Sequence, residues 1–292
     1  MTGPDREPPI PTAHPVLFAV LLFPFGALGG YVGVAVAYDL AQSGVGAGAI
    51  AGMLAVALIP NTWKFVWAPV VDTTLSPRTW YIGSALVTAA AVTALGLLPP
   101  QATFLLAIDA LVFFANLAAT FNAMTVEALA AQCAPDARKG SYGGWLQVGN
   151  LAGSGIGGGA ALWLGQVLPA RWMAAALLGI AFVLCALALR RIPALAPAPR
   201  DGAIARRIAG TVRDAWALAR TRGGALAILV LFLPMGTGAV SNLFSAVADD
   251  WHASVDTVAT VNGALGGVAA GLGCLVGGYF CCLLYTSDAA DE

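Results

Sequence analysis

Four polar side chains and one phenylalanine recur at helical spacing in an otherwise apolar stretch. The five residues are Asp109, Phe113, Asn116, Thr120 and Glu127. Their offsets of 0, 4, 7, 11 and 18 place them on one face of an α-helix. A polar stripe on an apolar helix faces a water-filled cavity or another helix rather than lipid. We expect the stripe to line a pathway for a polar solute or for protons. The alternative is a packing role, in which Asp109 pairs with a hydroxyl or an amide.

Lys64 interrupts a second uncharged run, which extends from Ala47 to Val71. A charge within hydrocarbon costs about 2.5–3.5 kcal/mol on insertion scales, so this lysine calls for an explanation. Counted from the predicted cytoplasmic end of its helix, Lys64 lies about 10 Å deep. Its ammonium group either snorkels to the membrane surface or turns inward, to pair with Asp72 or with a substrate anion. We do not expect a direct bond to Asp109, whose depth differs by roughly 10 Å in a hydrocarbon core of about 30 Å.

Three amides are further candidates for the same pathway. Gln147 and Asn150 lie three residues apart in a glycine-rich run, where small residues at every fourth position let helices approach closely. Asn242 follows Pro234 in a segment whose helix we expect to be loosened. Interrupted helices with polar groups form many transporter sites, although a packing kink is an equal alternative.

The composition and the uncharged runs indicate which elements position these residues. The chain has 292 residues, of which 59% are hydrophobic and 10% charged, and its mean hydropathy is +0.81. A soluble domain carries about 25% charged residues, so an ordinary soluble enzyme is excluded and an all-α polytopic membrane protein is expected. Eight runs are long enough to span a bilayer. They are Val16–Tyr38, Ala47–Val71, Thr79–Leu98, Ala102–Met124, Gly140–Leu168, Trp172–Leu189, Gly223–Ala248 and Thr257–Phe280.

The basic residues predict the orientation of these spans. Twelve of the 14 lie in the tail 1–15, in the loops after the second and fourth spans, or in residues 190–222, whereas Arg171 alone lies on the other side. The positive-inside rule therefore predicts a cytoplasmic N-terminus, and we expect the membrane to be a bacterial inner membrane. The segment 190–222 carries eight arginines and two aspartates, and we expect a basic amphipathic helix at the interface there. Its flanking spans argue against nucleic acid as the partner.

The run Lys64–Asp72 carries the pattern Lys-Phe-x-Trp-Ala-Pro-x-x-Asp. This pattern resembles the end of the second span in major facilitator superfamily transporters, in particular the branch of muropeptide permeases and acetyl-CoA transporters. Asp72 and Arg78 resemble a reduced form of the loop signature of that superfamily, which implies a cytoplasmic gate. The reduction lies in Ala68 at a glycine position and Thr73 at a basic position.

The resemblance implies a secondary transporter in which two six-helix bundles rock around a midplane site. Its substrate would be a small hydrophilic organic solute, with a muropeptide-like or acyl-CoA-like anion as the family-level expectation. The resemblance also implies coupling to an inward proton gradient, with Asp109 or Glu127 as the carrier. It implies no enzymatic activity and no cofactor or metal. The antiporter signature places a proline among the glycines of the fifth span, and its absence here leaves symport and exchange both open.

The same resemblance divides the chain into segments. Residues 1–15 would be a cytoplasmic tail, 16–189 the first six-helix bundle, 190–222 the linker and 223–280 the start of a second bundle. Residues 281–292 resemble translated adaptor sequence rather than a natural end. We therefore expect a chain truncated at its C-terminus, with about four further apolar segments encoded downstream, and a monomer when complete.

Two other functions use the same apolar helices. A non-transporting assembly or pigment-binding factor would have the same scaffold. An intramembrane lipid-modifying enzyme would need acids or histidines clustered at one membrane face, and the sequence shows no such cluster.

Overall fold

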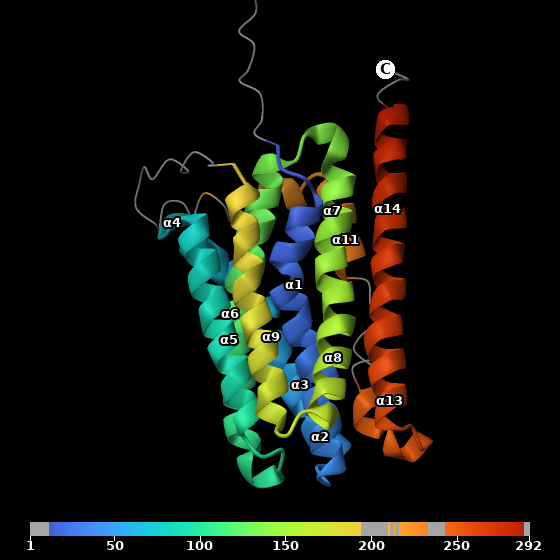
Figure 1. The fold of residues 1–292 in the computed structure, drawn as a ribbon. Helices are drawn as coiled ribbons and strands as arrows, with labels where there is room; N and C mark the ends of the chain where they lie inside the picture. The colour runs from blue at the N-terminus through green and yellow to red at the C-terminus, as the bar shows by residue number, and fades with distance from the viewer. Residues whose placement is uncertain (1–11, 194–209, 211–212, 214–215, 233–242, 289–292) are drawn as a thin grey trace, which may run out of the picture.

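The computed structural model describes residues 12–193, 210, 213, 216–232 and 243–288, and this part of the chain is helical without a β-strand. Five helices in it are long and apolar enough to cross a membrane, and a shorter apolar helix covers Ala47–Thr62. The five are Val16–Gln42, Pro77–Leu97, Ala102–Cys133, Arg171–Arg191 and Val255–Phe280. The prediction of an all-α protein with several membrane-spanning helices is therefore confirmed (Figure 1).

The first long helix has three consecutive parts. These are α1 (Val16–Gly30), the π-helical η1 (Tyr31–Val36) and α2 (Ala37–Gln42). The run expected as one second span forms two helices, α3 (Ala47–Thr62) and α4 (Lys64–Thr73), which meet at Trp63. The backbone at Trp63 departs from helical torsions, with φ −92° and ψ 19°. As a result, Lys64 is the first residue of α4.

The next helices run antiparallel to one another. Ser76 caps α5 (Pro77–Leu97) by accepting a hydrogen bond from the backbone of Thr79, and Pro77 occupies the first helical position. After the short η2 (Ala102–Phe104), α6 (Leu105–Cys133) continues past Met124, where the fourth span was expected to end. The helix therefore includes Glu127, as its expected place on the polar stripe requires.

The fifth and sixth expected spans are also built from consecutive pieces. The fifth comprises η3 (Asp136–Arg138), α7 (Lys139–Gln147), the π-helical η4 (Val148–Ala152) and α8 (Gly153–Val167). The sixth comprises α9 (Arg171–Cys185) and η5 (Ala186–Arg191). These ends agree with the predicted spans to within a few residues.

The later elements follow the basic segment. They are α11 (Arg222–Phe232), η6 (Phe244–Val247), η7 (Asp249–Trp251), α13 (Val255–Thr257), the π-helical η8 (Val258–Leu265) and α14 (Gly266–Asp288). The expected amphipathic helix at residues 204–216 lies almost entirely outside the described residues. Within the described part, the Arg220 guanidinium lies 5.4 Å from the ring centroid of Trp216.

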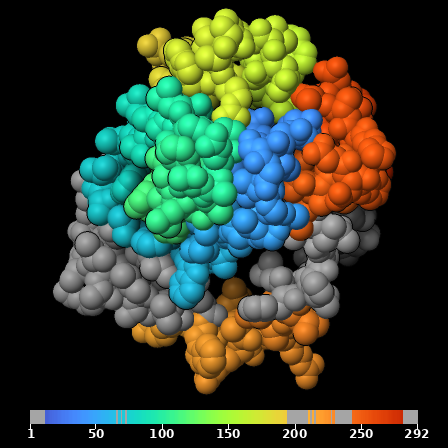
Figure 2. All heavy atoms as spheres, turned by 90° about the horizontal axis from the view of Figure 1, so that it is seen from below, coloured from blue at the N-terminus to red at the C-terminus, as the bar shows by residue number. Residues whose placement is uncertain are grey.

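The first helix lies at the centre of the bundle. Seen end-on, its blue end lies between the blue-green α5–α6 pair and the red α13–α14 segment (Figure 2). Two clusters of buried apolar side chains extend along it. One includes Leu28, Val32 and Leu40, and the other includes Phe18 and Leu21. Burial of these side chains supplies the packing that holds the polar residues described below in position.

Glycines bring α8 into backbone contact on two sides. A Cβ atom added at Gly30 would lie 1.8 Å from the carbonyl oxygen of Ser154, so the first helix packs directly on α8. A Cβ atom added at Gly155 would lie 2.4 Å from Cα of Gly267, so α14 packs on the opposite side. The predicted close approach of the glycine-rich fifth helix is confirmed.

Candidate functional site

Lys64 and Glu127 form an ion pair between α4 and α6. The Lys64 Nζ atom lies 2.5 Å from Oε2 of Glu127, and the two residues are 63 positions apart in the chain. The side chains keep 30% and 45% of their accessible surface, so the pair is only partly screened by protein.

An aromatic group lies beside this pair. Trp67 meets Phe121 edge-on with 6.3 Å between ring centroids, and Trp80 lies 5.2 Å from the same phenylalanine. The indole N–H of Trp80 donates to Oγ1 of Thr74 over 3.2 Å. The indole nitrogen of Trp67 is buried and has no acceptor among the described residues. Buried polar atoms are normally hydrogen-bonded, so this unpaired donor is an exception that needs a reason.

The rest of the α6 stripe includes the half-buried Asp109 and Asn116 and the fully buried Thr120. Asn116 donates to the carbonyl of Val112 over 2.8 Å, and Thr120 donates to the carbonyl of Asn116 over 2.7 Å. These polar groups are therefore satisfied by their own helix. Asp109 is half-buried, and its Oδ1 atom has no hydrogen-bond donor among the described residues. That solute or protons contact these residues stays a prediction.

The remaining predicted residues differ in how far the structure describes them. Asn150 donates to Oε1 of Gln147 over 3.3 Å, so these two amides are brought together. Arg78, at the start of α5, donates to the carbonyl of Ile192 over 3.0 Å and so contacts the end of the sixth helix. Asp72 lies in α4, but its side chain is outside the described residues, as is Asn242 altogether. The proposed Asp72–Arg78 gate stays a prediction.

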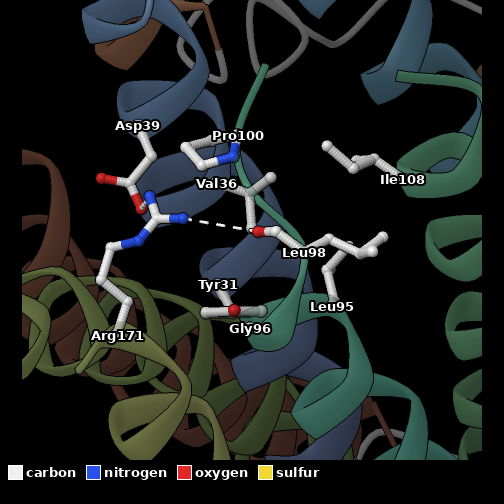
Figure 3. A pocket seen from close by; sticks show the side chains of 9 residues that line it. All are labelled: Tyr31, Val36, Asp39, Leu95, Gly96, Leu98, Pro100, Ile108 and Arg171. Carbon is white, nitrogen blue, oxygen red and sulfur yellow. Dashed lines mark hydrogen bonds and ion pairs between the residues drawn. The ribbon is translucent and has the colours of Figure 1, made fainter. Parts of the chain in front are cut away.

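A second ion pair lies at the opposite end of the bundle, which we call the α2 end. Nη1 of Arg171 lies 2.8 Å from Oδ2 of Asp39, and Nη2 lies 3.5 Å from the carbonyl oxygen of Leu98 (Figure 3). Tyr31 lines the small cavity beside them. The guanidinium thus joins α2, the start of α9 and the turn after α5. Sequence reasoning used Arg171 only for orientation and did not single out Asp39.

The α2 end also contacts the later part of the chain. Nε2 of Gln42 donates to Oδ1 of Asp249 over 2.7 Å, which joins the last residue of α2 to the first residue of η7. Asp39 lies one helical turn before Gln42, so the Arg171 pair holds the same turn that makes this contact. The Lys64–Glu127 pair thus lies at one end of the bundle, and two contacts lie at the α2 end. Of these two, the Asp39–Arg171 pair joins elements of the first six expected spans, and the Gln42–Asp249 bond reaches the later part of the chain.

Comparison with protein families identifies the scaffold. The family model described as Major Facilitator Superfamily matches residues 15–282, which is most of the chain. The chain belongs to the major facilitator superfamily. The comparison with curated proteins found no match. Proteins of this superfamily are generally membrane transporters rather than enzymes, so this facilitator is interpreted as an integral membrane protein in contact with lipid.

The Lys64–Glu127 pair is the feature of this facilitator that sequence reasoning missed. It weighed Asp72 or a substrate anion as the partner of Lys64 and assigned Glu127 to a proton pathway. One signal was present in the sequence, the depth of Lys64, which lies about 10 Å from the end of its predicted helix. The other comes from the observed end of α6, because Glu127 lies about 9 Å before Cys133 at 1.5 Å per residue. Opposite charges at equal depth on neighbouring apolar helices are strong candidates for a pair.

Proposed function

We propose that this facilitator is a permease that moves a small hydrophilic organic solute by alternating access, coupled to protons. Membership of the superfamily supports the scaffold and the transport class. The observation that carries the proposal is the Lys64–Glu127 pair, because a partly exposed ion pair between apolar helices has no need to exist for packing alone. Ionisable residues within membrane helices characteristically mark substrate or ion pathways.

In this proposal the end of the bundle that carries α4, opposite the α2 end, lies on the cytoplasmic side of a bacterial inner membrane. The distribution of basic residues supports this orientation. The N-terminus is then cytoplasmic, and Asp72 with Arg78 belongs to the cytoplasmic gate. The α2 end faces outward, where Gln42 and Asp249 hold the first helix against the later segments.

The polar residues have separate roles in this scheme. Asn116, Thr120, Gln147, Asn150 and Asn242 supply hydrogen-bonding groups along the pathway. Asp109 is the first choice for the coupling acid, because its Oδ1 atom is buried without a hydrogen-bond donor among the described residues. Glu127 is the second choice, since protonation would release Lys64. The muropeptide-like or acyl-CoA-like branch supplies the substrates to test first.

Uptake into proteoliposomes by the complete product of the gene tests this function. A panel of labelled muropeptides, acyl-CoA compounds and small organic anions would be offered with and without an inward proton gradient. We expect accumulation of one class that needs the gradient. Absence of uptake for every class, in a preparation that is folded and correctly inserted, would favour the non-transporting assembly factor instead.

The Asp109→Asn variant tests the coupling role. Asparagine keeps the size and hydrogen-bonding capacity of the side chain but cannot carry a proton. We expect gradient-driven accumulation to fall at least tenfold while exchange of solute across the membrane continues. Accumulation at the wild-type level would remove Asp109 from the coupling pathway and leave Glu127 as the candidate.

A further inference from the structure

Two hydrogen-bond donors lie on the same side of α4, facing α6. Lys64 and Trp67 are three residues apart, which places them on one helical face. Both side chains reach α6, the lysine through its ion pair with Glu127 and the tryptophan through its edge-on contact with Phe121. An ammonium group and an indole N–H are both donors without acceptor capacity, so a ligand that meets both must present acceptors.

The two donors differ in how they are satisfied. Lys64 is bonded to a carboxylate, whereas the indole nitrogen of Trp67 is buried and has no acceptor among the described residues. An acceptor oxygen that reached the indole N–H would satisfy this donor. One carboxylate oxygen of Glu127 is already bonded to Lys64, and no bond from Glu127 to Trp67 is present. The indole N–H of Trp67 therefore has hydrogen-bonding capacity left for an acceptor oxygen, and Lys64 gains that capacity when Glu127 leaves it.

The partial exposure of the pair makes exchange of partners feasible. Glu127 keeps 45% of its side-chain surface, so surrounding protein atoms do not hold its carboxylate in place beside Lys64. Solvent reduces the strength of such a pair compared with a fully buried one. A doubly charged or bidentate oxyanion gains more from an ammonium group than a single carboxylate does.

We propose that Lys64 and Trp67 bind an oxyanion group, either a phosphate or a carboxylate. Glu127 pairs with Lys64 in the absence of this group and competes with it for the lysine. The inference rests on the proposed function when the oxyanion is part of the transported solute. The same chemistry is offered by the headgroup phosphate of an anionic lipid. In both cases Glu127 sets the affinity by competing for the lysine.

Inorganic phosphate is the probe, and its binding to the full chain in a neutral detergent would be measured by ³¹P line broadening. Removal of the competitor should strengthen binding, so we expect Glu127→Gln to lower the phosphate Kd at least threefold. Lys64→Gln should raise the Kd more than tenfold, Lys64→Arg should largely retain binding, and Trp67→Phe should raise the Kd about threefold. Asp136→Asn is the matched control, because Asp136 pairs with Lys139 on an exposed surface, and it should not change the Kd.

Two outcomes would overturn the proposal. One is a Glu127→Gln protein with normal helix content that binds phosphate no more tightly than wild type. The other is a folded Lys64→Gln protein, judged by circular dichroism and elution volume, that binds phosphate as wild type does. The assay measures binding alone. If the variants change the Kd as expected but the protein does not transport, the result counts against the proposed function only. Unchanged Kd values in a transporting protein would count against the oxyanion site only.

A further arm distinguishes the two sources of the oxyanion. The titration is repeated in nanodiscs of phosphatidylcholine and in nanodiscs that contain phosphatidylglycerol. If the lipid headgroup is the ligand, phosphatidylglycerol raises the phosphate Kd by a larger factor in wild type than in Lys64→Gln, in which weak binding persists. If a soluble solute is the ligand, phosphatidylglycerol changes the Kd of both proteins by the same factor, which is the effect of surface charge alone.

Discussion

Gln42 donates a 2.7 Å hydrogen bond to Asp249, a residue 207 positions later in the chain. This contact joins the end of α2 to η7, and in the proposed orientation it lies on the outer side of the membrane. Alternating access requires contacts of this kind to open and close in each cycle. We therefore expect the Gln42–Asp249 contact to be transient during transport.

Cross-linking tests this expectation. With cysteines introduced by Gln42→Cys and Asp249→Cys, a short bifunctional thiol reagent should join the two segments and reduce uptake more than tenfold. Each single variant treated in the same way is the control for modification alone and for the native cysteines. Full uptake by the cross-linked protein would show that these segments do not separate in the cycle.

Asp39 should contribute to stability through its pair with Arg171. Their side chains keep only 24% and 35% of their surface, and Arg171 also reaches the carbonyl of Leu98. Loss of the carboxylate leaves a half-buried guanidinium without its charge partner. After allowance for solvent screening, we expect Asp39→Asn to reduce the free energy of unfolding by about 1 kcal/mol.

Thermal unfolding in detergent measures this effect, with Asp136→Asn as the matched control. Asp136 also pairs with a basic residue, but its side chain keeps 75% of its surface, so its removal should leave the melting temperature unchanged. Equal melting temperatures for Asp39→Asn and wild type would mean that the Arg171 contact adds nothing to stability.

The architecture was predictable because its signals are local. Uncharged runs of about 20 residues and glycines at every fourth position specify membrane helices and their close packing, and both expectations agree with the described helices. The break at Trp63 was not predictable from hydropathy, because the residues next to it are uncharged except for Lys64, and the only other charge in α3 or α4 is Asp72 near the far end of α4.

The candidate site was predictable only in part, because a pair across two helices depends on their relative depth and rotation. Glu127 was expected on the face of the helix of the fourth span, but ending the span at Met124 hid the fact that it lies at the depth of Lys64. Asp39 was overlooked because it lies just beyond the predicted end of the first span, where a lone acid is usually solvated. Its partner Arg171 starts a helix 132 positions later, and only the packing of α9 on the first helix brings the two together.

Gly155 should tolerate no side chain. A Cβ atom there would lie 2.4 Å from both the carbonyl oxygen of Gly263 and the Cα atom of Gly267, which are backbone atoms of η8 and α14. The two helices must separate to accept a methyl group, and overpacking of this kind costs about 1–3 kcal/mol. We expect Gly155→Ala to lower the melting temperature and to reduce transport.

Gly165→Ala is the control for this change, because Gly165 lies in the same helix and a Cβ atom there meets nothing within 4 Å. It should be neutral or slightly stabilising, since alanine is the better helix former. A Gly155→Ala protein as stable as the Gly165→Ala protein would contradict the close packing of α8 on α14.

Lys64 and Glu127 should be coupled in stability as well as in ligand binding. Removal of either partner leaves the other charge near apolar helices, whereas removal of both leaves none. We expect Lys64→Ala and Glu127→Ala each to destabilise the protein and the double variant to be less destabilised than their sum. Because both side chains are partly exposed, the coupling energy should be about 1 kcal/mol. Unfolding of the four proteins under one condition measures it, and Lys64→Arg, which keeps the charge, should stay close to wild type. Additive effects of the two single changes would mean that the 2.5 Å contact contributes no stability, and that Lys64 is held in place by its surroundings rather than by Glu127.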